Sequence, residues 1–112
     1  MSKHYPDKGD IVWIDMNPQL GHEQAGRRPA IIMSPLKYNS KVGLALVCPI
    51  TSHIKGYPFE VVIPDGFKVK CAILADQIRN VDWTARNIEL IFKAPQPLID
   101  EVQEKINAIL NG

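Results

Sequence analysis

The chain has 112 residues, of which 46% are hydrophobic and 22% are charged, a composition typical of one globular domain with a real core. It has no signal peptide and no apolar run near the length of about 18 residues that spans a membrane. We therefore expect a cytoplasmic protein in which residues 1–112 form a single domain. Cys48 and Cys71 lie among apolar residues and are expected to be buried, reduced thiols.

The net charge of +1 conceals an uneven distribution along the chain. Residues 21–86 hold nine Lys and Arg against five Asp and Glu, whereas the two ends are slightly acidic. A surplus of positive charge in the middle of the chain is what a phosphate-bearing partner requires.

An alternating run of apolar residues predicts a first strand over residues 10–16. Ile11 and Trp13 fall on one face of this strand, and Val12 and Ile14 fall on the other, so both faces should be at least partly covered. We expect Trp13 to pack in the core, as a single tryptophan in a strand usually does.

The rest of the chain predicts a mainly β fold, either a small barrel or a sandwich. Short apolar runs between Gly- and Pro-containing turns predict five further strands, over residues 29–33, 44–50, 59–63, 69–75 and 87–92. Residues 36–41 are expected to hold no more than one helical turn. Apolar residues at three- and four-residue spacing predict a C-terminal amphipathic helix that begins near Pro97 and packs over the open side of the sheet: Leu98, Val102, Ile106, Ile109 and Leu110.

Residues 21–30 (GHEQAGRRPA) form a connection longer than a hairpin requires, and they carry several reactive groups. A solvated loop that only keeps the protein soluble is one interpretation. Polar groups at three strand ends extend the candidate set to Glu23, Gln24, Arg27, Arg28, Thr51, Ser52, His53, Lys55, Gln77 and Arg79. No nucleotide-binding glycine motif or metal-ligand spacing accompanies them, so we expect no cofactor. Such a set suits moving a proton beside a phosphate and stabilising the charge that develops on it.

Short motifs in a fixed order extend over most of the chain: YPD at 5–7, EQAG at 23–26, RPA at 28–30, KGYPFEVV at 55–62 and LADQ at 74–77. Trp83 and the pair Ala85-Arg86 follow them. One such motif alone is weak, but their order is specific. Together they resemble the MazF/PemK family of toxin endoribonucleases, the poison components of toxin–antitoxin pairs, and within it most nearly the MazF branch.

The resemblance implies an SH3-like small barrel with short helices and a C-terminal α-helix, working as a homodimer without metal or membrane. It implies a toxin that cleaves single-stranded RNA, often messenger RNA, and thereby inhibits translation and growth until an acidic, MazE-like antitoxin restrains it. The family's catalytic residues fall on Glu23, Arg28 and Thr51. Contacts with RNA are expected from Gln24, Arg27, Ser52, Lys55, Gln77, Arg79 and Arg86.

The reaction expected of such a protein is attack by a ribose 2′-hydroxyl on its own 3′ phosphate, which leaves a 2′,3′-cyclic phosphate and a 5′-hydroxyl. Glu23 is the expected base and needs a pKa raised by partial burial. Arg28 is the expected phosphate ligand, and Thr51 holds a phosphate oxygen or the attacking hydroxyl. The general acid is left open, because His22 and His53 compete for acid–base roles as residues of a type that titrates near neutral pH.

Two other functions remain open from the sequence. A non-catalytic toxin of the same barrel, like the gyrase poison CcdB, acts by binding a protein through a tryptophan near its C-terminus, whereas this chain ends in residues 109–112 (ILNG). A plain SH3-like module would hold nucleic acid on its basic surface without cutting it. Incubating RNA with the protein in EDTA separates the three possibilities.

Overall fold

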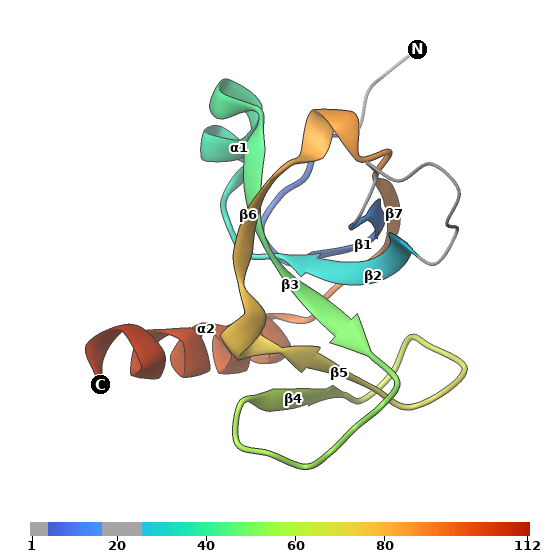
Figure 1. Cartoon of the computed structure of the whole chain (residues 1–112), viewed down its shortest axis with the longest axis vertical. Helices are drawn as coiled ribbons and strands as arrows, with labels where there is room; N and C mark the ends of the chain where they lie inside the picture. The colour runs from blue at the N-terminus through green and yellow to red at the C-terminus, as the bar shows by residue number, and fades with distance from the viewer. Residues whose placement is uncertain (1–4, 17–25) are drawn as a thin grey trace.

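The computed structural model describes residues 5–16 and 26–112, and it shows a curled antiparallel sheet with one long helix beside it (Figure 1). The helices in these ranges are α1 (Leu36–Val42), α2 (Gln96–Asn111) and the short 3-10 helices η3 (Ala75–Gln77) and η4 (Trp83–Ala85). The strands are β1 (Asp10–Asp15), β2 (Arg27–Ile32), β3 (Leu44–Thr51), β4 (Glu60–Ile63), β5 (Cys71–Leu74), β6 (Arg79–Asp82) and β7 (Glu89–Lys93). They pair in the order β4-β5-β3-β2-β1-β7, with β6 added to β3. None of the helices in the described ranges is long and apolar enough to cross a membrane.

Strands β1, β2 and β3 form the centre of the sheet and bury side chains on both faces. On β1, Ile11 belongs to one apolar cluster and Val12 to a second, and on β2 Ile31 and Ile32 divide in the same way. The first cluster includes residues of β4, β5 and α2, and the second includes residues of β6 and η4. The prediction that both faces of the first strand are covered is confirmed. Burial of apolar area is the main stabilising term in folding, so the sheet centre is the firmest part of the scaffold.

Strand β3 is eight residues long, and two different strands share one of its edges. Residues 44–47 pair with β6, whereas Ile50 and Thr51 pair with β5. The short helix η3 joins β5 to β6 at this change of partner. As a result, Thr51, Gln77 and Arg79 line the same hollow although they come from three different elements.

Strand β6 and helix α1 both differ from the expectations based on sequence. Only Val81 of β6 is buried, so no alternating apolar pattern marks this strand, and its pairing with β3 defines it instead. Helix α1 extends over seven residues rather than one turn, and it ends at Gly43, whose left-handed φ of 79° favours glycine. The buried side chain of Asn39 fixes α1 to the rest of the chain by donating to the Pro6 carbonyl oxygen at 2.8 Å.

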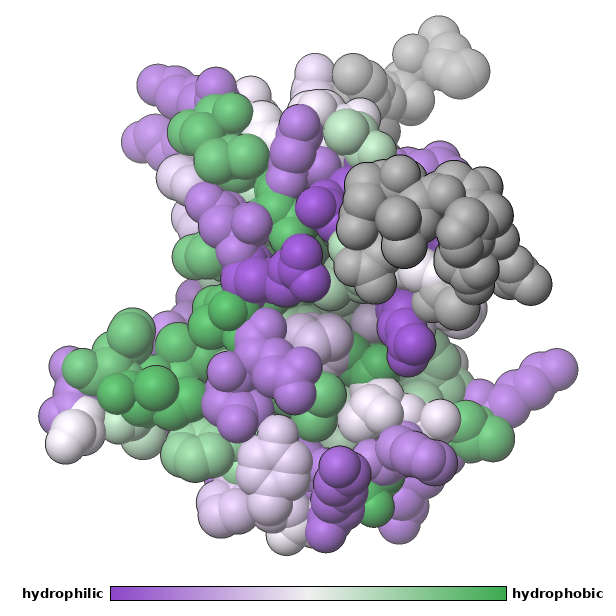
Figure 2. All heavy atoms as spheres, viewed as in Figure 1, coloured by the Kyte–Doolittle hydropathy of each residue, from purple (hydrophilic) through white to green (hydrophobic). Residues whose placement is uncertain are grey.

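Helix α2 confirms the predicted C-terminal helix but not the full length of its apolar stripe. Leu98, Val102 and Ile106 are buried, and α2 contacts η3 and β4. Ile109 and Leu110 are instead 43% and 76% exposed. Figure 2 shows apolar side chains, in green, on the surface at this end of α2. The last turns of α2 extend beyond the sheet (Figure 1), so the end of the stripe has no strand to pack against.

Candidate active site

Three adjoining pockets meet at the end of β3. Thr51, the last residue of β3, lines all three, and their volumes are about 540, 240 and 210 Å³. Arg28 lines the two larger pockets, and Gln77 lines the two smaller ones. We refer to the three pockets that share Thr51 as the Thr51 groove.

Most of the site residues predicted from the sequence come together in the Thr51 groove. They belong to β2, to the end of β3 and the loop after it, to η3 and to the start of β6. The fold thus gathers into one surface residues as far apart in the chain as Arg27 and Arg79. The predicted residues that line the groove are Arg27, Arg28, Thr51, Ser52, Lys55, Gln77 and Arg79.

The two adjacent arginines of β2 have different surroundings. Arg27 is held by the carboxylates of Asp15 and Glu89, each 3.1 Å from its guanidinium, and by the carbonyl oxygen of Asn87 at 2.8 Å. The Arg28 side chain is exposed and forms no hydrogen bond or ion pair with another residue in the described ranges. Its guanidinium is therefore available to bind two oxygens of one phosphate, the geometry that suits arginine best.

Arg28 lies within β2, whereas the sequence pattern placed it in the preceding loop. It pairs with Ile14 of β1, and the next residue, Pro29, pairs with Trp13. Pairing with β1 thus extends β2 two residues before its predicted start, an effect of tertiary context that local propensity does not reveal. Because the backbone of Arg28 is fixed in a ladder, the position from which its side chain extends is well defined.

Trp13 lines the largest pocket of the Thr51 groove, so the prediction that it packs in the core is wrong. Its side chain is 38% exposed, and it belongs to neither apolar cluster. It lies between Pro29 of β2 and Glu89 of β7 in the sheet, on the side that opens to the groove. Phe67 and Val69 line the same pocket and complete an apolar wall. An exposed indole beside arginines is an arrangement on which an unpaired base stacks.

The loop after β3 is fixed by hydrogen bonds to two carboxylates. Glu60 accepts the backbone N–H of Lys55 at 2.9 Å and that of Gly56 at 2.6 Å. The Tyr57 hydroxyl donates to Asp76 at 3.0 Å, and this hydrogen bond is the main reason that the pKa of Tyr57 is raised. These contacts hold Lys55 and Tyr57 at the smallest pocket of the groove.

The Thr51 hydroxyl is oriented by its neighbour. Its Oγ1 accepts the backbone N–H of His53 at 3.0 Å, which leaves the hydroxyl proton free to be donated. The His53 side chain is exposed and lines two of the three pockets. Arg79 lines the same pocket as Arg28 and Thr51, so that pocket gathers two guanidiniums and a hydroxyl. These are groups that stabilise negative charge on a phosphate.

Arg86 lies apart from the groove. Its guanidinium donates to the backbone carbonyl oxygens of Asp15 at 3.0 Å and Met16 at 2.7 Å, so it closes the end of β1. We expect these hydrogen bonds to contribute to stability, and the contact of Arg86 with RNA stays a prediction.

Glu23, Gln24 and His22 lie outside the described residues, and their roles stay predictions. On either side of them, the backbone N–H of Met16 donates to the carbonyl oxygen of Gly26 at 2.7 Å. Met16 also lines the pocket that contains Arg28. The described chain therefore leaves β1 and enters β2 directly beside the Thr51 groove.

The other reactive groups of the described chain do not form a second centre. Within residues 5–16 and 26–112, no group of three or more His, Cys, Asp and Glu could hold a metal ion. Cys48 and Cys71 are buried free thiols, as predicted. Burial, together with the charge of Asp76, raises the pKa of Cys48 to about 12, and burial also raises the pKa of Cys71. Neither thiol is ionised at neutral pH, so neither is a reactive nucleophile.

Comparison with known proteins identifies the family. Residues 7–110 match the model of the PemK-like, MazF-like toxins of type II toxin–antitoxin systems. The chain belongs to this family. The endoribonuclease toxin MazF of Escherichia coli (strain K12) is 40% identical over 110 residues, which cover 98% of each chain. The endoribonuclease EndoA of Bacillus subtilis (strain 168) is 31% identical over 108 residues, which cover 92% of each chain.

Solved structures of MazF proteins have the same fold as this MazF-like toxin. The crystal structure of MazF from Deinococcus radiodurans superposes with a TM-score of 0.86 and 44% identity, covering 98% of this chain and 100% of that one. A MazE–MazF complex from the same organism contains a chain with a TM-score of 0.85 and 39% identity, covering 97% of this chain and 98% of that one. These likenesses confirm the predicted family and the mainly β, barrel-like fold with its C-terminal helix.

The groove of this MazF-like toxin also contains residues that were not predicted as site residues: Trp13, Tyr57, Glu60 and Phe67. Tyr57 and Glu60 belong to the KGYPFEVV motif at 55–62, which gave a signal for the segment but not for their individual contacts. Trp13 and Phe67 gave no such signal, because an apolar residue in a strand or turn has the same pattern whether it packs inward or lines a pocket.

Proposed function

We propose that this chain is the toxin of a toxin–antitoxin pair and an endoribonuclease that cleaves single-stranded RNA, above all messenger RNA, and so stops translation and growth. The observation that carries the proposal is the convergence of Arg28, Thr51 and Arg79 on one pocket. Its relatives in Escherichia coli and Bacillus subtilis are named endoribonucleases. A basic groove with an exposed tryptophan suits an unpaired strand, whose bases are free to stack.

The proposed reaction uses the substrate's own hydroxyl as the nucleophile. The 2′-oxygen of a ribose forms a bond to the adjacent 3′ phosphorus, and the bond from that phosphorus to the 5′-oxygen of the next nucleotide breaks. The products are a 2′,3′-cyclic phosphate and a 5′-hydroxyl. Arg28 binds two phosphate oxygens, Arg79 adds a second positive charge, and the Thr51 hydroxyl donates to an oxygen on which charge develops.

Two protons move in this reaction. A base takes the proton of the 2′-hydroxyl, and an acid gives a proton to the leaving 5′-oxygen. By the resemblance to the family, the proposed base is Glu23. His53 is the competing acid–base residue within the described chain, because it lies at the rim of two pockets beside Thr51. The remaining contacts with RNA are proposed for Gln24, Arg27, Ser52, Lys55, Gln77 and Arg86.

The proposed partner is an acidic, MazE-like antitoxin, and the proposed active form is a cytoplasmic homodimer in which each chain is one domain. A related MazF from Deinococcus radiodurans is known in a MazE–MazF complex. The positive surplus of residues 21–86 suits an acidic segment that places carboxylates where phosphates would bind. Antitoxin and RNA then compete, and the affinity for antitoxin falls with salt. Titrating labelled, uncleavable RNA off the toxin with antitoxin peptide tests this, and simultaneous binding at unchanged affinity contradicts it.

The proposed activity is tested by incubating RNA with purified protein in excess EDTA and identifying the new ends. Cleavage should persist and leave 2′,3′-cyclic phosphates, while DNA of the same sequence stays intact because it lacks the nucleophile. Ends that carry a 5′-phosphate, or loss of cleavage on chelation, contradict the mechanism. Binding of RNA without cleavage would favour the plain binding module, and neither binding nor cleavage would favour the protein-binding toxin.

A further inference from the structure

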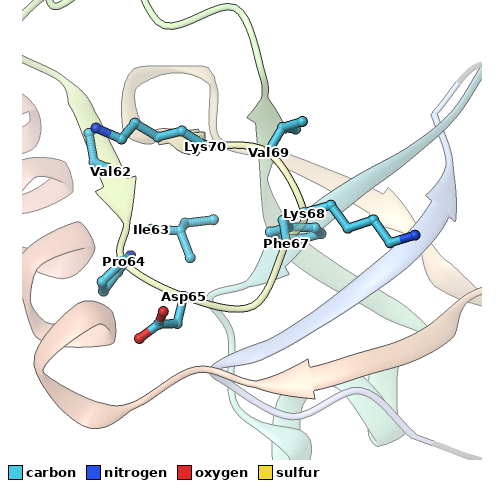
Figure 3. Close-up of a pocket in the computed structure, with 8 residues that line it drawn as sticks. All are labelled: Val62, Ile63, Pro64, Asp65, Phe67, Lys68, Val69 and Lys70. Atoms are coloured by element: carbon cyan, nitrogen blue, oxygen red, sulfur yellow. The ribbon is translucent and has the colours of Figure 1, made fainter.

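The loop between β4 and β5 borders a second hollow beside the Thr51 groove. This hollow, which we call the β4–β5 pocket, has a volume of about 430 Å³ and is lined by residues between Val62 and Lys70 (Figure 3). Phe67 and Val69 line both this pocket and the largest pocket of the groove. Val69 is 61% exposed, so the boundary between the two pockets is an exposed apolar rim that is accessible to a strand lying in the groove.

The loop that carries this rim is fixed against the sheet. Phe67 packs against Phe92 of β7, with their ring centroids 5.5 Å apart. Gly66 has a φ of 123°, and a Cβ added there would lie 2.2 Å from the Phe92 ring. Only glycine allows the backbone to approach the ring this closely. The pocket is therefore preformed, and a ligand that enters it does not have to order the loop first.

The β4–β5 pocket has a positive edge. Lys68 and Lys70 are exposed, and neither forms a hydrogen bond or an ion pair with any other described residue. Figure 3 shows that their side chains extend to opposite sides of the loop, whereas Asp65 supplies the one carboxylate in the pocket lining. Two available ammonium groups beside a hollow with an apolar side suit a nucleotide of an RNA strand, with neighbouring phosphates at the lysines and the base against Phe67 and Val69.

We propose that the β4–β5 pocket binds a nucleotide of the RNA strand outside the cleavage position, with Lys68 and Lys70 contacting phosphates of the strand on opposite sides of that nucleotide. This inference rests on the proposed function and adds a second binding region to it. RNA fits better than an acidic protein segment, because the apolar rim is continuous with the wall formed by Trp13 in the groove. The lysines contribute to affinity and to the reach of the site along the strand, and they take no part in the chemistry.

The test measures binding of 2′-O-methyl oligouridylates of about 5 and about 12 nucleotides, lengths within the range that small single-strand-binding barrels cover. The double variant K68A/K70A should bind the longer strand about 20-fold more weakly at about 0.1 M salt, with a salt slope smaller by about 1.4, because each lost phosphate contact removes about 0.7. Its affinity for the shorter strand should stay within about twofold. The matched control K37A/K41A removes the same charge from α1, away from the pocket, and should bind both strands as the wild type does.

Each result decides the proposal. Equally weakened RNA binding in the two double variants would mean that net charge alone causes the effect, and it would overturn the proposal that this pocket binds RNA. Unchanged binding of the longer strand by K68A/K70A, with weaker binding of an acidic antitoxin peptide, would assign the lysines to a protein partner and also overturn it. If the wild type cleaves RNA but binds both strands equally, the proposed function stands and the pocket alone fails. If the wild type neither binds nor cleaves RNA, both proposals fall.

Discussion

The two walls of the Thr51 groove are built in different ways. On the sheet wall, Arg28 and Thr51 lie in paired strands, and their cross-strand partners, Ile14 and Ala72, are buried. On the loop wall, the backbone at Lys55 is held by hydrogen bonds to a single carboxylate at the protein surface. The difference indicates a division of roles, because a reaction needs geometry that only packed strands supply, whereas substrate contacts tolerate small displacements.

The largest expected effect follows from removing the free guanidinium of the sheet wall. Arg28→Ala should lower the single-turnover cleavage rate by about 10²–10³, as removal of one charge-stabilising donor does. Its stability should change by less than about 0.5 kcal/mol, because the side chain is exposed and unpaired in the described chain. Arg28→Lys should restore little of the rate, since an ammonium does not reproduce the bidentate fork. Cleavage at a near-normal rate by Arg28→Ala would remove Arg28 from the site.

Arg27 provides the matched control for Arg28. Arg27→Ala removes the same charge from the next residue, but it also removes the ion pairs with Asp15 and Glu89. We expect Arg27→Ala to lower the melting temperature more than Arg28→Ala does, and to lower the cleavage rate less. Thermal unfolding and rate measurements on the two variants side by side show whether the sheet wall separates these roles.

The interior of the sheet wall predicts a loss of stability at alkaline pH. Burial raises the pKa of Cys48 from 9.0 to about 12, so the folded state keeps the thiol protonated while the unfolded state ionises it above pH 9. This stabilisation is complete below pH 9.0 and is lost as the pH rises towards 12. In that range the free energy of unfolding should fall more steeply for the wild type than for Cys48→Ala, by about 1 kcal/mol per pH unit. Urea titrations at several alkaline pH values measure the two slopes, and parallel slopes would contradict the burial of this thiol.

A smaller effect, on the KM for RNA, is expected from changing Glu60, which holds the backbone of the loop wall. Glu60→Gln replaces charge-assisted hydrogen bonds to the Lys55 and Gly56 backbone with weaker neutral ones. The KM for RNA should rise about three- to tenfold, with kcat within about twofold, because the loop contacts substrate and not the reacting atoms. Glu104→Gln removes the same charge from α2 and serves as the control. A lower kcat at unchanged KM would show instead that this loop positions catalytic groups.

The smallest effect is expected from Tyr57→Phe. This change removes one exposed hydrogen bond to Asp76 and leaves the aromatic ring in the pocket. The KM should change by less than about twofold. Because the pKa of Tyr57 is raised, the hydroxyl stays protonated at neutral pH, and the effect should be the same at every pH below its titration. Steady-state kinetics at several pH values test this, and a tenfold or larger effect would give the loop wall the same weight as the sheet wall.

Sequence patterns predicted the sheet wall better than the loop wall, and the reason is physical. Alternation and helical spacing report burial within one segment, so they located most strands and α2. These patterns do not show which segments contact one another. Strand β6 has one buried residue, Val81, so it carries no alternating pattern. The hydrogen bond between Tyr57 and Asp76 joins residues nineteen positions apart, which no local pattern reports. Trp13 has the sequence pattern of a core residue. The curl of the sheet, which exposes this face of β1 to the groove, depends on all the strands together and cannot be predicted from one segment. Arg28 and Thr51 were predicted from motifs, and the fold was needed to show that they face one pocket.

In the proposed reaction, the Thr51 groove promotes attack by the substrate's own 2′-hydroxyl. The most direct measurement uses an RNA whose cleavage position has been mapped, with only the ribose on the 5′ side of the cut changed to 2′-deoxyribose. We expect that this strand is not cut at that position, yet competes with unmodified RNA for the protein at an affinity within a fewfold of the original. Continued cleavage at the modified position would show that another nucleophile acts, which would exclude the proposed reaction.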